Sequence, residues 1–133
     1  MTVELPANYQ PSDSEEFMNP LQVEYFRAQL EKAHAELRRE LEGIPHVESE
    51  GASREGDQTD HASADTEREF QILNRDRIQT MLRQTEQALA RLENGTFGIC
   101  EDTGEPIGLR RLMAQPTTAL SLEAQEARER RSG

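Results

Sequence analysis

Apolar side chains recur at alternating spacings of three and four residues in two separate stretches of this chain. In a helix this spacing places them on one narrow stripe, which is typical of two helices that pack along a coiled-coil seam. The sequence therefore predicts two helices that pack against each other. The first seam is Val23, Phe26, Leu30, Ala33 and Leu37, and the second is Ile78, Leu82, Thr85, Leu89 and Leu92.

Residues that favour helix ends bound both stretches. Asn19-Pro20 suits an N-cap followed by the first helical position, and Gly43 favours the end of the first helix. The second helix is expected to begin within residues 60–63 and to stop at Gly95. Further apolar residues extend the two seams with a small drift of register, and these are Leu41, Ile44, Phe70 and Leu73.

The predicted fold class is mostly α, a long antiparallel helical hairpin followed by a small knuckle and a C-terminal helix. The knuckle is expected because glycines and prolines interrupt short apolar segments after the second helix. The expected segments are an N-terminal tail (1–18), the hairpin (19–94, with its tip near 46–62), the knuckle (95–117) and the last helix (118–133).

The negative charge of the chain is concentrated in the N-terminal tail, where residues 1–18 contain 4 acids and no bases, and in the middle of the chain around the hairpin tip. The net charge is −11, which argues against general binding to nucleic acid phosphates. Residues 44–69 contain 8 acids and 2 bases, so this segment alone carries −6. Hydrophobic residues make up 34% of the chain, too few for a large globular core, and thin helices that bury a narrow stripe are the expected alternative.

The sequence shows no sign of an enzyme or a membrane protein. The three histidines, His34, His46 and His61, are far apart, and no catalytic triad order, phosphate loop or histidine metal motif is present. The sequence lacks a signal peptide and a membrane-spanning apolar run, and the single Cys100 excludes an internal disulfide. We therefore expect a cytoplasmic protein without catalytic activity.

The knuckle contains an incomplete zinc-finger turn. Cys100-Glu-Asp-Thr103-Gly has the outline of Cys-x-x-Cys-Gly with its second ligand replaced, and Ser121 and Ala124 stand where a downstream cysteine pair would be. A structural zinc site needs four Cys or His donors. Cys100 is therefore expected to be a small, partly buried apolar residue rather than a metal ligand.

Three motifs together resemble the DksA/TraR family. They are the run FGICEDTGEPIGLRRLMAQPTTALSLEA in the knuckle and last helix, NRDR (Asn74 to Arg77) in the second helix, and Asp57-x-x-Asp60-x-Ala62 in the hairpin loop. The resemblance implies a regulator that binds RNA polymerase directly, without contacting DNA or a membrane, and inserts its coiled coil into the secondary channel. It also implies altered open-complex stability at ribosomal RNA and amino-acid promoters, together with guanosine tetraphosphate in the stringent response. A monomer is expected.

The resemblance assigns roles to particular residues of the hairpin. It places Asp57, Asp60 and Ala62 at the tip near the polymerase active site, although the two aspartates could also cap the loop and the second helix. It places Asn74 and Arg77 on the flank that faces the polymerase. The alternative is that the two residues lie on a solvated helix face and contact no partner.

The chain departs from the zinc-type family members at two sites. The four zinc positions hold Cys100, Thr103, Ser121 and Ala124, as in cysteine-poor, zinc-independent paralogues. Packing is then expected to hold the knuckle, through Phe97, Ile99, Ile107, Leu109, Leu112, Leu120 and Leu122. The positions that help to bind the alarmone hold Gln84, Gln115 and Gln125, which supply no charge, so we expect weakened or altered alarmone contact.

Other functions would share some of these features. A Gre-like transcript-cleavage factor would have an acidic hairpin tip without the knuckle, a generic coiled-coil adaptor would not need its tip, and a metal sensor would bind zinc at the knuckle. Arg110 and Arg111 could bind an acidic partner surface or cap the last helix, and the sequence does not separate these roles.

Overall fold

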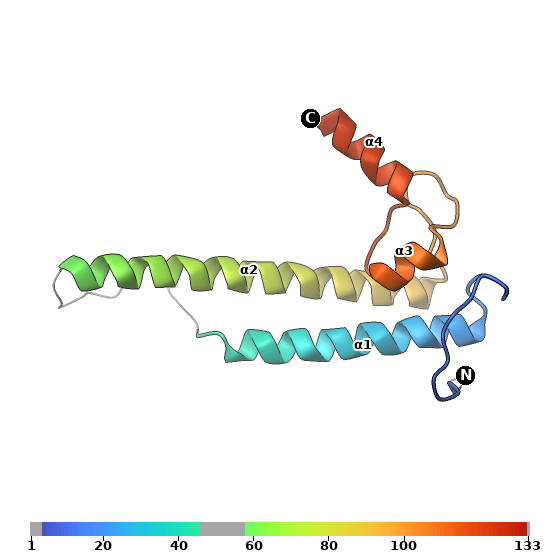
Figure 1. Cartoon of the computed structure of the whole chain (residues 1–133), viewed down its shortest axis with the longest axis horizontal. Coiled ribbons are helices and arrows are strands. Elements are labelled where there is room, and N and C mark those ends of the chain that lie inside the picture. Colours follow the sequence, from blue (N-terminus) through green and yellow to red (C-terminus); the bar gives the residue numbers. More distant parts are fainter. Residues whose placement is uncertain (1–3, 46–57, 133) are drawn as a thin grey trace. The chain divides into compact units, whose positions relative to one another are not determined.

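Four helices make up the regular structure of the residues that the computed structural model describes, 4–45 and 58–132, with backbone alone for 58–62. Helix α1 spans Pro20–Gly43, α2 Gln58–Asn94, α3 Leu109–Ala114 and α4 Leu122–Ser132 (Figure 1). Within these ranges the only β pairing is an isolated antiparallel bridge between Ile99 and Pro106. The mostly helical fold class is confirmed.

The starts and stops of the two long helices follow the expected signals. The Asn19 side chain accepts a hydrogen bond from the Gln22 N–H at 2.8 Å, which is the N-cap contact of α1. Gly95 adopts φ 77° directly after α2, a conformation that glycine reaches without steric cost. The α2 helix begins at Gln58, slightly before the expected range of 60–63.

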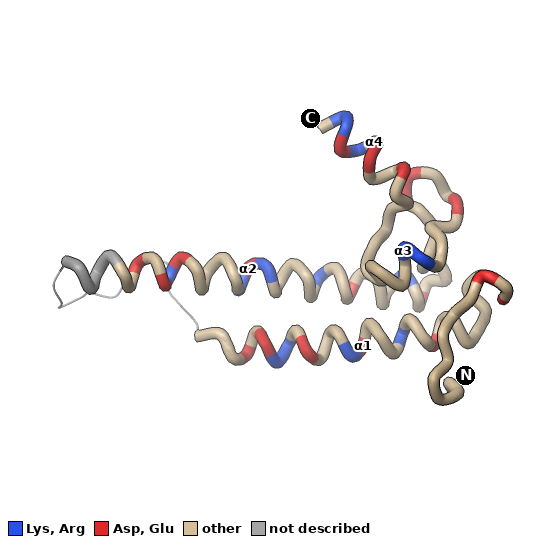
Figure 2. Tube along the Cα trace, in the orientation of Figure 1, with Lys and Arg blue, Asp and Glu red and all other residues tan. Residues whose placement is uncertain are grey.

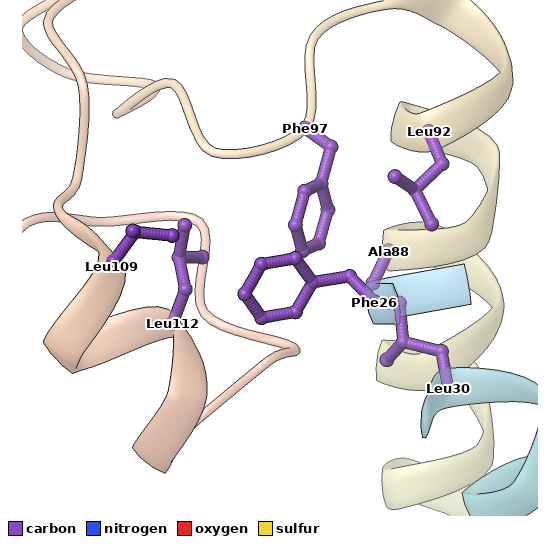
Figure 3. Packing of buried hydrophobic residues seen from close by; sticks show 7 residues of the cluster. All are labelled: Phe26, Leu30, Ala88, Leu92, Phe97, Leu109 and Leu112. Carbon is purple, nitrogen blue, oxygen red and sulfur yellow. The ribbon is translucent and has the colours of Figure 1, made fainter. Parts of the chain in front are cut away.

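The chain divides into two compact units, Met1–His34 with Gln84–Gly133, and Ala35–Arg83. In the first unit, the start of α1 packs against the end of α2 and against α3, around one apolar core (Figure 3). The Phe26 and Phe97 rings lie at its centre, 5.3 Å apart. Burial of such side chains contributes about 1.5–3 kcal/mol each. The buried core residues are Phe26, Leu30, Ala88, Leu92, Phe97, Leu109 and Leu112.

The buried side-chain amide of Gln22 connects the N-terminal segment of the first unit to α1 by hydrogen bonds. Gln22 is fully buried, and its side-chain oxygen accepts the Met18 N–H at 2.7 Å. Its side-chain nitrogen donates to the Ser12 carbonyl at 3.3 Å. Because both ends of the amide are paired, its burial carries no penalty for a lost hydrogen bond.

The second unit has a smaller core of Leu37, Ile78 and Leu82, against which Leu41 and Ile44 pack. The expectation that Phe70 and Leu73 extend the α2 seam is wrong, because each is 68% exposed. The reason is that α1 ends at Gly43 and its last apolar residues already pack around Ile78, about two turns along α2 from Phe70.

The knuckle and last helix also depart from the expected packing. Residues 109–114, within the expected knuckle, form a short helix, α3. Leu122 is 52% exposed, so its predicted role in packing is wrong. Helix α4 buries Ala124 instead, because Ala124 lies half a turn further round the helix than Leu122.

Candidate functional site

The knuckle brings the four expected zinc positions into one small cluster. The Cys100 N–H donates to the Glu105 carbonyl and the Gly104 N–H to the Cys100 carbonyl, both at 2.8 Å, which closes a tight turn. The Glu101 N–H donates to the Ala119 carbonyl at 2.9 Å, and this bond brings the segment before α4 beside the turn. Cys100, Ser121 and Ala124 are buried, whereas Thr103 is exposed.

The thiol of Cys100 is set in a polar environment despite its burial. Burial alone would raise its pKa, but hydrogen bonds from the Ser121 backbone and from the Thr103 side chain and backbone outweigh this and lower the pKa to about 6. Cys100 is thus buried, as expected, but it is not simply an apolar residue. The hydrogen-bond donors around the sulfur favour the thiolate over the thiol.

The donors at these four positions do not fit a zinc ion. They offer one thiol, two hydroxyls and a methyl group, whereas structural zinc takes four Cys or His ligands. The Ser121 hydroxyl is already engaged, because it accepts the Ala124 N–H at 3.1 Å as the N-cap of α4. Among the described residues no group of three or more His, Cys, Asp or Glu side chains could hold a metal.

Arginine side chains hold the segment between α3 and α4. Arg111 donates from Nε to the Leu120 carbonyl at 2.8 Å, and its Nη2 donates to the Thr118 hydroxyl and to the Gln125 side-chain oxygen. Arg91 donates to the Thr117 carbonyl at 3.1 Å. Arg111 therefore has a structural role at the start of α4, which sequence reasoning left open, while Arg110 is exposed.

An ion pair joins the acidic turn of the knuckle to α4. Arg128 donates from Nε to Asp102 Oδ2 at 2.7 Å and from Nη2 to Oδ1 at 2.5 Å. The pair lowers the pKa of Asp102 and raises that of Arg128, mainly through these hydrogen bonds. Figure 2 shows the acidic turn and the bases of α4. Sequence reasoning missed this pair, because 26 residues separate its members.

The three expected alarmone positions line one cavity of about 330 Å³, the glutamine pocket. Gln84 comes from α2, Gln115 from the segment after α3 and Gln125 from α4. Arg91 and Arg128 also line the pocket and are the only cationic side chains in its lining. Glu101 is the only acidic side chain in the lining. Its size is that of a small-molecule site.

The flank residues Asn74 and Arg77 lie together on α2 in the second unit. Arg77 Nη2 donates to the Asn74 side-chain oxygen at 2.9 Å, and Nη1 approaches the Met81 sulfur at 3.4 Å. These contacts fix the guanidinium on an exposed helix face, which also carries the exposed Phe70 and Leu73.

The tip residues are only partly within the described structure. Asp57 lies outside the described residues, and Asp60 and Ala62 belong to α2 but their side chains are not described. Of the histidines, His34 pairs with Glu86 at 3.1 Å in the first unit, while His46 and the His61 side chain lie outside the described part. None of the helices in the described ranges is long and apolar enough to cross a membrane.

Comparison with known proteins gives consistent matches along the chain. Residues 22–92 match the family model of the DnaK suppressor protein DksA, N-terminal domain, and residues 95–130 match the prokaryotic dksA/traR C4-type zinc finger. The RNA polymerase-binding transcription factor DksA of Caulobacter vibrioides is 44% identical over 126 residues, covering 94% of this chain and 88% of that protein. The protein of the same name from Escherichia coli K12 is 36% identical over 122 residues, covering 91% and 80%.

A solved structure agrees with the fold. The transcription factor DksA2 from Pseudomonas aeruginosa matches with a TM-score of 0.74 and 34% sequence identity, covering 92% of this chain and 93% of that one. The family models match more than half of the chain, and the relatives align over nearly its full length. These matches and the helical fold lead to one conclusion: the chain belongs to the DksA/TraR family.

Proposed function

We propose that this chain binds RNA polymerase directly and regulates transcription initiation. The observation that carries the proposal is its likeness, over 94% of its length, to a relative named as an RNA polymerase-binding transcription factor. We further propose that it acts in the cytoplasm as a monomer, without catalytic activity and without binding DNA. Its net charge of −11 supports the last point, because DNA phosphates would repel it.

The proposed mode of action is insertion of the hairpin tip into the secondary channel of the polymerase. Asp57, Asp60 and Ala62 would act near the active site, where carboxylates can influence a bound cation or a mobile basic element. Asn74 and Arg77 would contact the wall of the channel. The contact between their side chains supports this role, because it holds the guanidinium in place before binding and reduces the entropy lost there.

We propose that the protein works without zinc. The single thiol at the family's four zinc positions and the engagement of Ser121 as an N-cap support this. The core around Phe97 and Leu112 and the Arg111 hydrogen bonds would supply the stability that zinc supplies elsewhere. The proposed working segments are the tail 1–18, the hairpin 19–94 with its tip near 46–62, the knuckle 95–117 and the last helix 118–133.

Guanosine tetraphosphate is proposed as a co-regulator whose contact with this protein is weak. Gln84, Gln115 and Gln125 line one pocket, and an amide forms a weaker bond to phosphate than a charged group does. In an assay of a ribosomal RNA promoter, the alarmone should add little to the effect of this protein. A response as strong as that of a zinc-type family member would contradict this proposal.

Polymerase binding is tested by competition. The unlabelled full chain, freed first of metal and then of chelator, is titrated against a labelled zinc-type DksA already bound to RNA polymerase. The proposal expects full displacement, and Arg77→Gln should weaken it. Arg75→Gln, which replaces a neighbouring arginine on α2, is the matched control and should displace as well as the parent chain. Absence of displacement would contradict the proposal. Transcript cleavage in a stalled complex would instead indicate a Gre-like factor.

A further inference from the structure

The glutamine pocket has little free positive charge to offer an anion. Of its lining residues only Arg91 and Arg128 are cationic, and both are already engaged within the protein. Arg91 donates to the Thr117 carbonyl at 3.1 Å and is close enough to Glu101 for attraction between their charges. An anion that enters the pocket must therefore displace an existing partner of Arg91 or Arg128 to gain a charged contact.

Arg128 is held by a carboxylate that lies outside the pocket lining. Asp102 does not line the glutamine pocket but lines the neighbouring cavity with Thr103 and Ala124. It accepts two hydrogen bonds from Arg128, at 2.7 and 2.5 Å, from one edge of the guanidinium. Two oxygens of a phosphate can bind this edge in the same way, so Asp102 and an anion compete for it.

The exposure of the pair makes this competition possible. The Arg128 side chain is 47% exposed and that of Asp102 29%, so neither group is locked in the core. A surface ion pair of this kind is weak, and its long arginine side chain can exchange partners. The pair is thus strong enough to bias Arg128 and weak enough to open.

We propose that Asp102 acts as an internal competitor that withholds Arg128 from anions in the glutamine pocket. This inference rests on the proposed function, because it explains how the alarmone response of this chain is kept low. The class of ligand is a di- or polyphosphate anion. Opening of the Asp102–Arg128 pair turns a nearly neutral pocket into one with a free guanidinium.

The test is a titration of the full chain with inorganic pyrophosphate, followed by NMR of the side-chain amides of Gln84 and Gln125. Asp102→Asn should tighten binding by about fivefold, because one charge-assisted contact becomes available to the anion. Asp65→Asn, which removes the same charge from an exposed residue of the other unit, should leave the affinity unchanged. The double variant D102N/R128Q should lose the gain.

A second variant keeps the test independent of how Asp102→Asn folds. In the otherwise unchanged chain, Arg128→Gln should alter pyrophosphate affinity by less than about twofold, because Arg128 is already occupied. A larger loss would show that Arg128 is free and would overturn the proposal. Equal affinities of Asp102→Asn and the parent chain would also overturn it. Because no polymerase is present, these failures would leave the promoter assay of the proposed function unaffected.

Discussion

Arg111 Nε lies 2.8 Å from the carbonyl oxygen of Leu120, and this bond ties α3 to the residue that precedes the N-cap of α4. The same guanidinium also contacts Thr118 and Gln125. One half-buried side chain therefore connects α3, the segment before α4 and α4 itself. In a zinc-type family member a metal would connect comparable segments, and we propose that the Arg111 contacts take its place here.

Replacement of Arg111 by lysine should destabilise the first unit. Lysine keeps the charge but loses the planar fork, so the contacts to Leu120 and Thr118 cannot form together. We expect a loss of about 1–3 kcal/mol in the free energy of unfolding, measured by urea denaturation. Arg110→Lys, at the exposed neighbouring position, should change it by less than about 0.5 kcal/mol. Equal losses for the two variants would contradict the structural role of Arg111.

Gly98 is expected to be intolerant of a side chain. Its φ is +85°, and a Cβ there would lie 3.0 Å from Cζ of the Phe17 ring. Gly98→Ala should therefore destabilise the chain by about 1–3 kcal/mol in urea denaturation. Gly104→Ala is the control, because its φ of +75° imposes similar strain but no atom lies within 4 Å. If the two variants lose the same stability, the contact with Phe17 is unimportant.

The spacing of apolar residues predicted most of the fold, but not the local geometry of the site. Phe26, Leu30 and Ile78 were identifiable because a coiled-coil seam repeats along the helix. Ala88 was not, since its methyl group gives no strong apolar signal although it is fully buried. The Asp102–Arg128 pair joins two surface residues far apart in sequence, and no periodic pattern marks such a contact.

The Cys100 thiol should titrate near pH 6 in the folded protein. This can be followed by the ultraviolet absorbance of the thiolate, with Cys100→Ser as the blank. Because folding lowers this pKa, the stabilisation from the thiolate is fully present above the unfolded pKa and is lost as the pH falls through about 6. The stability of the parent chain relative to Cys100→Ser should therefore rise between about pH 6 and pH 9. A folded pKa of 8 or above would contradict the environment assigned to Cys100.

Removal of metal should leave the fold unchanged. With one thiol at the four family positions, treatment with a strong chelator should not shift the melting temperature, and metal analysis of the purified protein should find zinc far below one equivalent. A zinc-type DksA treated in the same way is the positive control and should lose stability. One equivalent of zinc in this protein, lost together with its fold on chelation, would contradict zinc independence.

The central claim is that the hairpin tip acts on RNA polymerase, and the lifetime of the open complex at a ribosomal RNA promoter tests it most directly. The parent chain, freed of metal beforehand, should shorten this lifetime. Asp60→Asn should still displace a labelled zinc-type DksA from the polymerase but should lose the effect on lifetime, whereas Asp65→Asn should retain both. An unchanged lifetime with the parent chain, or a full effect with Asp60→Asn, would contradict the account.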